Sequence, residues 1–157
     1  MVFLPDVIDK YQLKFFEYGS PEYHQATQLR YRLFYQEHHI PLASIFDSKE
    51  KQDRHLVITA NPENKVLAYG QLVQNSLEEF QIHQMVVEPA YQGKGLGKLI
   101  LQTLIATTIQ QGASSLVLNA RMTKVGFYQK FGFKTISEVF ASLSTGVPHI
   151  KMRKDIF

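Results

Sequence analysis

The chain of 157 residues contains no cysteine. This absence excludes disulfide bonds, thiolate metal ligands and acyl transfer through a cysteine thioester. No group of His, Asp and Glu residues has the spacing of a metal site, and the sequence lacks the nucleophile elbow that a Ser-His-Asp triad would need. We therefore expect chemistry that uses neither a metal nor a covalent enzyme intermediate.

Long hydrophobic runs are also lacking, since no apolar segment approaches the ~20 residues of a membrane span. The first residues, Met1-Val2-Phe3-Leu4-Pro5-Asp6, have neither the basic region nor the cleavage pattern of a secretory signal. The net charge is +3, and the basic residues are spread along the chain, which does not indicate a nucleic-acid partner. We expect a cytoplasmic protein that binds neither membranes nor nucleic acid.

Hydrophobic residues make up 45% of the chain, and no low-complexity stretch or linker interrupts it, which predicts one globular domain over residues 1–157. Ser20-Pro21 has the pattern of a helix N-cap followed by proline, and helical spacing of apolar residues continues to Glu37. A second helix is expected from Lys94 to Gln111, ended by Gly112, and a long polar loop over 38–53. Strands are expected at 12–18, 54–60, 66–74, 80–87, 115–120, 134–140 and 147–152, and a short helix at 124–131.

Three alternate glycines stand between the strand at 80–87 and the helix after it, in Gln92-Gly93-Lys94-Gly95-Leu96-Gly97. Glycines at such a junction let the backbone bend and point several N–H groups at one place, near the positive end of a helix dipole. An anionic phosphate is the natural ligand there. The spacing fits neither the dinucleotide fingerprint, which needs a third glycine at Lys98, nor the ATP-binding loop. A flexible surface turn is the alternative explanation.

A second motif follows the strand at 115–120 and reads Gly126-Phe127-Tyr128-Gln129-Lys130-Phe131-Gly132-Phe133. Together the two motifs resemble the acetyl-CoA-dependent N-acetyltransferases of the GNAT superfamily, whose pyrophosphate-binding signature is Gln/Arg-x-x-Gly-x-Gly/Ala. The resemblance covers roughly residues 80–133. It implies the GNAT fold, an α+β arrangement with a mixed sheet of about six to seven strands and about four helices.

Further motifs resemble the ElaA-like branch of this superfamily. They are Tyr31-Arg32-Leu33 with Glu37, then Asp53-Arg54-His55, and the tail from Gly146 to Met152, which contains Pro148-His149. The branch carries Leu-Arg-x-x-x-Phe-x-x-Glu-Gln in its first helix, and Tyr35-Gln36-Glu37-His38 departs from that pattern.

The resemblance also implies where acetyl-CoA binds. Main-chain groups at Met85, Val86 and Val87 match those that pair with pantetheine, and Tyr128 matches the tyrosine that gives a proton or a hydrogen bond to the CoA sulfur. A packing role for Tyr128 beside Phe127 and Phe131 is the alternative. Asn119 matches a polar position on pantetheine or substrate, and it could instead cap the next helix. The pyrophosphate cradle comprises Gln92, Gly93, Lys94, Gly95, Leu96 and Gly97. The basic residues Lys94, Lys98, Arg121 and Lys124 flank the two halves of the proposed phosphate site and could meet the charge of CoA.

The general base is not fixed by this resemblance, because Gln81 stands where many members carry a glutamate. Strand alternation puts His83 on the same face as Gln81 and nearer the glycine loop. An imidazole with a pKa near 6.5 can accept a proton directly or through water. His149 and His55 are rival candidates, and a structural role is the alternative for each histidine.

The sequence thus predicts an N-acetyltransferase that moves the acetyl group of acetyl-CoA to a primary amine of a small molecule or peptide by direct attack. Two alternatives remain at this point. The chain could be a non-catalytic acyl-CoA-sensing module, or an interaction domain that uses the exposed aromatic residues Tyr31, Phe34 and Tyr35. A monomer or a homodimer fits the sequence equally well.

Overall fold

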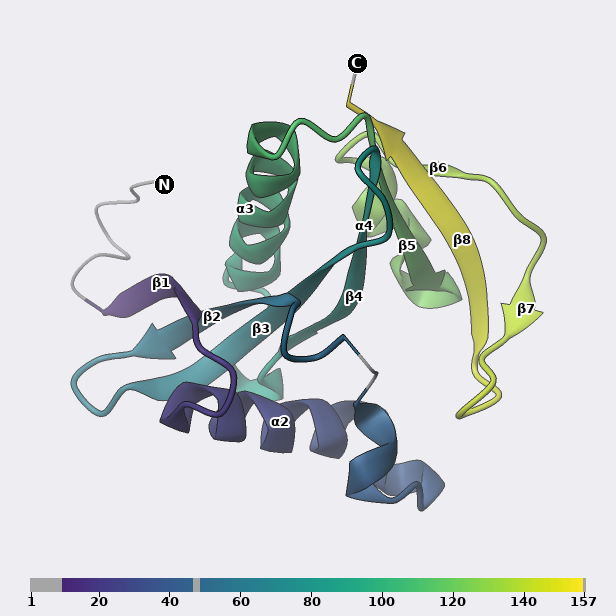
Figure 1. Ribbon diagram of the computed structural model, residues 1–157. Helices are drawn as coiled ribbons and strands as arrows, with labels where there is room; N and C mark the ends of the chain where they lie inside the picture. The colour runs from purple at the N-terminus through teal and green to yellow at the C-terminus, as the bar shows by residue number, and fades with distance from the viewer. Residues whose placement is uncertain (1–9, 47–48, 157) are drawn as a thin grey trace.

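The computed structural model describes residues 10–46 and 49–156, in which one mixed sheet is the central feature (Figure 1). The order of its strands is β1-β2-β3-β4-β5-β8-β6, and β7 also pairs with β8. Paired strands are antiparallel except for β4 and β5. The eight strands are β1 (Tyr11–Phe16), β2 (Arg54–Ala60), β3 (Lys65–Gln74), β4 (Glu79–Val87), β5 (Ser115–Arg121), β6 (Lys134–Thr135), β7 (Phe140–Ala141) and β8 (Pro148–Asp155).

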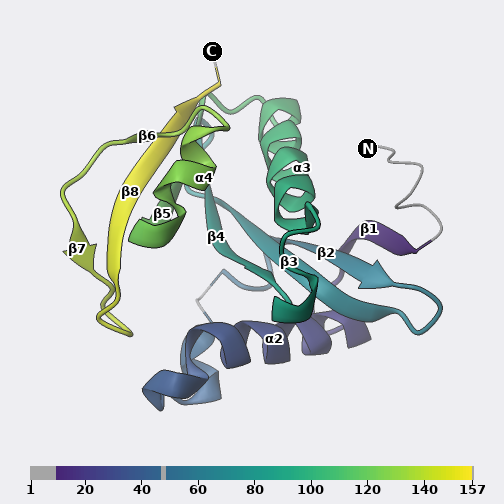
Figure 2. The same cartoon turned by 180° about the vertical axis from the view of Figure 1, so that it is seen from behind.

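Helices cover both faces of the sheet (Figures 1 and 2). The helix α2 (Pro21–Phe34) packs on one face, where Leu29 shares a core cluster with Val86 of β4. The other face is covered by α3 (Leu96–Gln110), with α4 (Val125–Gln129) packed against the same core. The resulting α+β arrangement agrees with the one predicted from the sequence.

A glycine in β3 sets how closely α3 approaches the sheet. A Cβ atom at Gly70 would lie 2.6 Å from Ile100 Cγ2 and 3.0 Å from Leu104 Cδ1, both fully buried side chains of α3. No residue larger than glycine fits there without displacing the helix. The position therefore fixes the distance between α3 and the middle of the sheet.

The parallel strands β4 and β5 separate halfway along their length. Their pairing runs from Glu79↔Ser115 to Ile82↔Leu118 and ends there, while β4 continues against β3 and β5 continues against β8. Beyond this point each strand has one neighbour in the sheet. A wedge-shaped gap therefore opens between the carboxyl ends of two strands that are paired at their start.

A β-bulge accompanies the separation. Two residues of β4, His83 and Gln84, lie opposite Gln71 of β3. The extra residue reverses the alternation of side chains, so that Ile82 packs in the core under α3 whereas Val86 packs in the core under α2. The bulge thereby places Gln84 on the α2 face.

The region after α2 differs from the prediction. The helix ends at Phe34, not at Glu37, because Tyr35 leaves the helical conformation with φ −125° and a 3-10 turn follows over Gln36–His38. The expected polar loop over 38–53 contains a second 3-10 turn, Leu42–Ile45, and the buried residue Glu50. Residues 47–48 of that loop lie outside the described ranges.

Three other elements also differ from the prediction. The strand expected over 134–140 is replaced by β6 and β7, which pair separately with β8, and 3-10 turns stand at Pro89–Tyr91 and Met122–Lys124. The expected helix over 124–131 is the five-residue α4, because a 3-10 turn at Met122–Lys124 precedes it and the N–H groups of Phe131 and Gly132 bond three residues back, to Tyr128 and Gln129. Among the described residues there are thus three α-helices, one fewer than expected.

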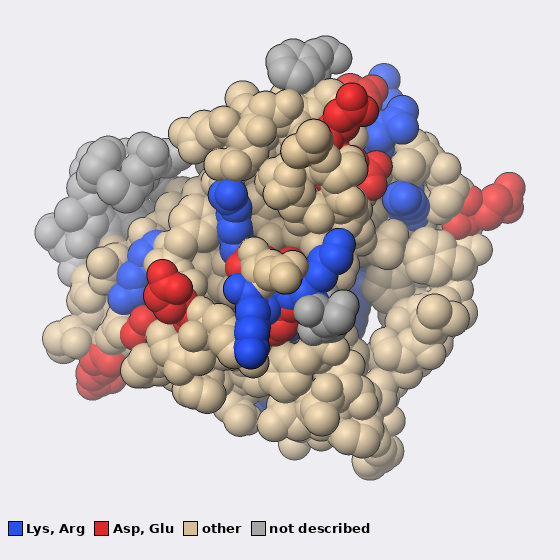
Figure 3. Space-filling view, in the orientation of Figure 1, with Lys and Arg blue, Asp and Glu red and all other residues tan. Residues whose placement is uncertain are grey.

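The charged side chains are mixed over the surface. On the face shown in Figure 3, Lys and Arg side chains are interspersed with those of Asp and Glu. This distribution agrees with the even spread of basic residues along the sequence.

Candidate active site

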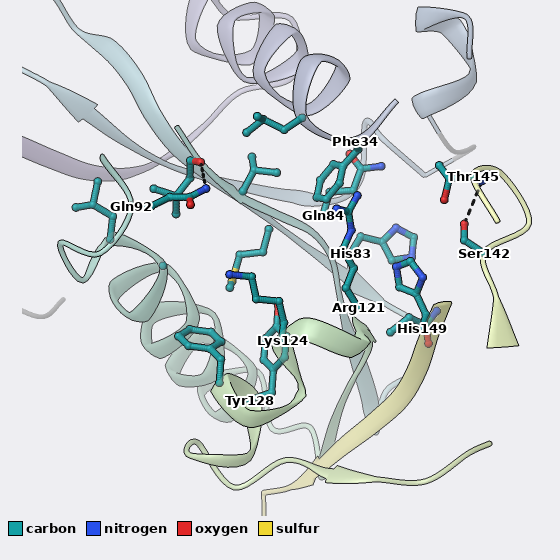
Figure 4. Close-up of a pocket in the computed structure, with 18 of the residues that line it drawn as sticks. Phe34, His83, Gln84, Gln92, Arg121, Lys124, Tyr128, Ser142, Thr145 and His149 are labelled. Carbon is teal, nitrogen blue, oxygen red and sulfur yellow. Dashed lines mark hydrogen bonds between the residues drawn. The ribbon is translucent and has the colours of Figure 1, made fainter. Parts of the chain in front are cut away.

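A cleft with a volume of about 640 Å³ lies at the gap between β4 and β5. It receives residues from five parts of the chain that are far apart in sequence: the end of α2, β4, the glycine loop, the β5–α4 segment and the tail before β8 (Figure 4). Of the predicted site residues, the cleft brings together His83, Met85, Val86, Val87, Gln92, Gly93, Gly95, Leu96, Gly97, Lys98, Asn119, Tyr128 and His149.

The glycine loop has the conformation that its sequence predicts. Gly93 and Gly95 have φ values of +78° and +83°, in the left-handed region that L-residues other than glycine rarely adopt. Gly95 is the N-cap of α3. The backbone N–H groups in the first turn of that helix have no partner within the helix and lie next to the loop. A Cβ atom at Gly97 would lie 3.6 Å from Val87 Cγ2. The loop therefore offers unpaired backbone donors close to the end of β4.

Some side chains of the glycine loop hold the loop in place, and others line the cleft. The Gln92 side-chain amide donates a hydrogen bond to the Val87 carbonyl oxygen at 3.2 Å, which holds the loop against β4. Lys98 lines the cleft. The Lys94 ammonium instead lies 5.1 Å from the centre of the Tyr91 ring, and Lys94 is absent from the cleft wall. The structure thus separates Lys94 from the other predicted residues of the loop.

Tyr128 lies on α4 with its ring edge-on to Phe127 and Phe133. Burial raises the pKa of its hydroxyl to about 12. The hydroxyl therefore stays protonated throughout the neutral range and is available as a hydrogen-bond donor. Among the described residues the hydroxyl has no hydrogen-bond partner, while the ring packs against Phe127 and Phe133.

The three candidate histidines lie in two different environments. His83 is exposed and His149 is half-buried, and both line the cleft, where Figure 4 draws their side chains close together. His55 lies outside the cleft in the core, with Nδ1 2.6 Å from the Tyr69 hydroxyl and Nε2 2.7 Å from the Glu50 carbonyl oxygen. A carbonyl can only accept, so Nε2 of His55 carries the proton and Nδ1 accepts from Tyr69.

His149 has a defined tautomer. Its Nδ1 lies 2.7 Å from the Val147 carbonyl oxygen, and this contact requires a proton on Nδ1. In the neutral ring Nε2 is then the acceptor, and no described residue bonds to it. The Phe140 ring stacks on the imidazole, with centroids 6.2 Å apart. This is the geometry of an oriented imidazole that can take a proton at Nε2.

Asn119 lies near the end of β5, exposed to the cleft. The residues at the N-cap positions of the next two helical segments are Arg121 and Lys124, and neither segment has a side-chain cap. The structure therefore does not place Asn119 as a helix cap. Gln81, which the sequence resemblance matched to a glutamate position, accepts a hydrogen bond from Asn75 and does not line the cleft.

A model of the acetyltransferase (GNAT) domain family matches residues 26–156. This chain belongs to the GNAT acetyltransferases. The chain is similar to the uncharacterized N-acetyltransferase YjcF of Bacillus subtilis (strain 168), with 28% identity over 130 residues that cover 83% of this chain and 90% of YjcF. The predicted superfamily is confirmed, and with it the assignment of the chain as an acyltransferase.

Solved structures give the same family. Escherichia coli ElaA is 26% identical and superposes with a TM-score of 0.76, covering 92% of this chain and 99% of that one. This similarity confirms the expected likeness to ElaA. A GNAT acetyltransferase from Elizabethkingia anophelis, solved with acetyl-CoA bound, has a TM-score of 0.70 at 16% identity, covering 94% and 99% of the two chains, and so shares the fold.

Two further observations on the described residues concern membranes and metal ions. Within residues 10–46 and 49–156, no helix is long and apolar enough to span a membrane. In the same ranges, no cluster of three or more His, Asp or Glu residues is arranged to hold a metal ion.

Sequence reasoning missed several residues of the GNAT cleft. Phe34 and Tyr35, predicted as exposed interaction residues, are half-buried and line its wall. Gln84 became part of the site only through the bulge in β4. Leu33, Ser142, Ser144 and Thr145 also line the cleft. For the two serines and the threonine, the only available signal was their nearness to the Pro148-His149 motif.

A buried polar network supports this wall from behind. Arg30 is fully buried and forms an ion pair with Glu50, with 2.5 Å between Nη1 and Oε1. Arg30 also donates to Gln84 and Gln71, and Gln84 in turn donates to the Tyr35 hydroxyl at 3.0 Å. A signal for this network is present in the sequence, since Arg30 lies four residues after Ala26 on the apolar stripe of α2. The network ties the loop after α2 to the two strands that form the bulge.

Proposed function

We propose that this protein transfers the acetyl group of acetyl-CoA to a primary amine by direct attack of the amine on the thioester. The observation that carries the proposal is the convergence of the predicted site in one cleft. The predicted cofactor and catalytic residues line it, with the exceptions of Lys94 and the rival base candidate His55. Membership of a family that uses acetyl-CoA supports the same cosubstrate.

The cleft has the parts that acetyl-CoA requires. The edge of β4 that faces the gap has no strand beside it past Ile82, so the backbone at Met85, Val86 and Val87 can pair with the extended pantetheine arm. The glycine loop and the first turn of α3 offer backbone N–H groups for the pyrophosphate. Lys98 and Lys124 also line the cleft and can supply compensating positive charge. Bound there, the cosubstrate supplies an activated acyl group.

Chemical balance requires two protons to leave the amine. The ammonium form loses one to become a nucleophile, and the nitrogen loses a second as the C–N bond forms and the C–S bond breaks. One of these protons is recovered by the departing CoA thiol, and the other is released. The protein must therefore provide a proton acceptor near the amine and stabilise negative charge on sulfur.

Tyr128 is assigned to the sulfur. With a pKa of about 12, its hydroxyl is a weaker acid than a thiol with a pKa of about 8.5. Complete proton transfer to the thiolate would therefore be uphill, and donation of a hydrogen bond to the growing charge is the favoured role. The thiolate can then take its proton from solvent or from the amine.

His149 is assigned as the proton acceptor, directly or through a water molecule. Its Nδ1–H is held by the Val147 carbonyl, so the lone pair of Nε2 is available, and the same carbonyl stabilises the ring once it is charged. His83 lines the same cleft and is the second candidate. His55 is disfavoured because both its ring nitrogens face hydrogen-bonding partners in the core.

An acetylation assay with a panel of amines tests the function. Product formation together with stoichiometric CoA release supports it, and tight binding of acetyl-CoA without turnover of any amine would favour a sensing module. The base is tested by pH profiles of kcat/KM. His149→Gln should remove the inflection that a histidine base gives to this profile, and His83→Gln should retain it. Loss of the inflection in His83→Gln alone would assign the base to His83.

A further inference from the structure

The charge inside the cleft is one-sided. Among its described lining residues there is no aspartate or glutamate, whereas Lys98, Arg121 and Lys124 are present together with His83 and His149. The buried carboxylate of Glu50 is compensated by Arg30 and is not part of the wall. An acceptor with several positive charges would meet no compensating charge from this wall and would be repelled by the cations. The lining instead favours a ligand with negative charge.

Lys98 and Lys124 lie in a different part of the cleft from Arg121. Lys98 belongs to the first turn of α3, and Lys124 lies directly before α4, which carries Tyr128. Figure 4 shows Gln92, Lys124 and Tyr128 toward one end and Arg121 toward the other, in the region of Phe34 and Gln84. The first two cations are therefore placed to meet the phosphates of CoA. Arg121, which the sequence alone grouped with them, is placed toward the acceptor.

The Arg121 guanidinium is oriented and has no ion-pair partner among the described residues. It lies 5.1 Å from the centre of the Phe34 ring, in cation–π contact across the cleft from β5 to the end of α2. The N–H groups of a guanidinium point outward in its plane, so a guanidinium that lies over an aromatic ring can still donate hydrogen bonds. Two parallel donors of this kind match the two oxygens of a carboxylate.

Arg121 and the proposed base are cross-strand neighbours. In the antiparallel pairing of β5 with β8, Arg121 stands directly opposite His149. Side chains of directly opposed residues project from the same face of a sheet, with Cβ atoms about 5 Å apart. A molecule whose anionic group binds Arg121 therefore presents an amine a few bonds away to His149.

We propose that the acceptor is a primary amine that also carries a carboxylate, such as an amino acid, and that Arg121 is the residue that selects it by binding this carboxylate. This inference rests on the proposed acetyl transfer and names the substrate class of the same site. Thr145 and Ser142 lie on the adjoining wall and offer further hydroxyl donors to the carboxylate (Figure 4).

The test compares each amino acid with its own carboxamide, which retains the amine and the shape but lacks the charge. Leucine, phenylalanine and β-alanine are assayed against their amides at saturating acetyl-CoA. Removing the carboxylate lowers the pKa of the ammonium group, so that more of the amide is in the reactive free-amine form at neutral pH. Intrinsic reactivity thus favours the amide, and a preference for the acid must come from the protein.

We expect kcat/KM for at least one acid to exceed that for its amide by about 10- to 100-fold, the range for a hydrogen-bonded charge pair. Arg121→Gln should remove this preference and leave KM for acetyl-CoA unchanged. Lys124→Gln is the matched control, because it removes a cation from the same cleft. It should raise KM for acetyl-CoA and leave the ratio of acid to amide as in the parent.

Other results of these assays would refute the acceptor class, the role of Arg121 or the proposed function. Equal rates for acids and amides, or a preference for a polyamine such as spermidine, would refute the acceptor class and leave acetyl transfer standing. An Arg121→Gln variant that keeps the acid preference but binds acetyl-CoA weakly would place Arg121 in the CoA site and overturn its assignment. Failure to acetylate any amine would overturn the proposed function and the acceptor class together.

Discussion

Replacing Glu50 by glutamine tests whether the buried network behind the cleft is as strongly coupled as its geometry indicates. The Glu50 carboxylate is nearly inaccessible to solvent and accepts hydrogen bonds from Arg30, Tyr23 and Gln71. Glutamine has the same shape, so the substitution opens no cavity. It leaves the charge of Arg30, whose side chain has no solvent exposure, without compensation.

The expected loss of stability follows from that uncompensated charge. Breaking a buried ion pair by removing one partner costs about 3 to 5 kcal/mol. One hydrogen bond is also lost, because an amide NH2 group in place of Glu50 Oε2 would be a donor facing the Nε2 donor of Gln71. A domain of this size is stable by about 5 to 15 kcal/mol, so the variant should fold but unfold at markedly lower urea concentration.

Equilibrium unfolding in urea, followed by circular dichroism, measures this effect. Arg32→Gln is the matched control, since the Arg32–Glu88 ion pair has an Arg32 side chain that is 52% exposed and should contribute less than about 1 kcal/mol. The double variant Arg30→Met, Glu50→Gln should regain part of the loss, because no unpaired charge remains. A Glu50→Gln variant within about 0.5 kcal/mol of the parent, like an ordinary surface substitution, would refute the reasoning.

The same ion pair predicts how stability depends on pH. Burial disfavours the charged form of Glu50, but the hydrogen bond and the charge of Arg30 outweigh it and hold the pKa of the carboxyl below its usual range. A lowered folded-state pKa gives stabilisation that is complete above the unfolded value of about 4.3 and is lost as pH falls through the folded value. Stability of the parent should therefore fall more steeply than that of Glu50→Gln below about pH 4.3.

Three further predictions concern the loop, the tyrosine and the packing of α3. Gly95→Val should weaken CoA binding at least tenfold by calorimetry, because a β-branched residue at φ +83° distorts the cradle, and unchanged affinity would contradict the pyrophosphate assignment. Tyr128→Phe should lower kcat by about 10²-fold with little change in KM for acetyl-CoA, and unchanged turnover in a chemistry-limited assay would leave Tyr128 a packing role. Gly70→Ala should cost about 1 to 3 kcal/mol in thermal unfolding through overpacking against Ile100, whereas Gly126→Ala, with open space around it, should not destabilise, and equal effects would contradict the packing argument.

Local chemistry explains why much of the site was readable from the sequence. The glycines at 93, 95 and 97 are required by backbone geometry, and Tyr128 follows its strand at a short fixed distance, so that both motifs are contained within single strand-to-helix segments. The boundaries of β2, β3 and β4 were likewise close to prediction, because their apolar runs are bounded by turn residues.

The sequence by itself was enough to predict a GNAT acetyltransferase with a glycine loop before α3 and a tyrosine on α4. Only the tertiary structure decided which charged and titratable residues share the cleft. A bulge turned Gln84 toward α2, strand pairing set Arg121 opposite His149, and burial took His55 out of reach. These placements depend on contacts between residues distant in the chain, whose pairing and burial no local pattern encodes.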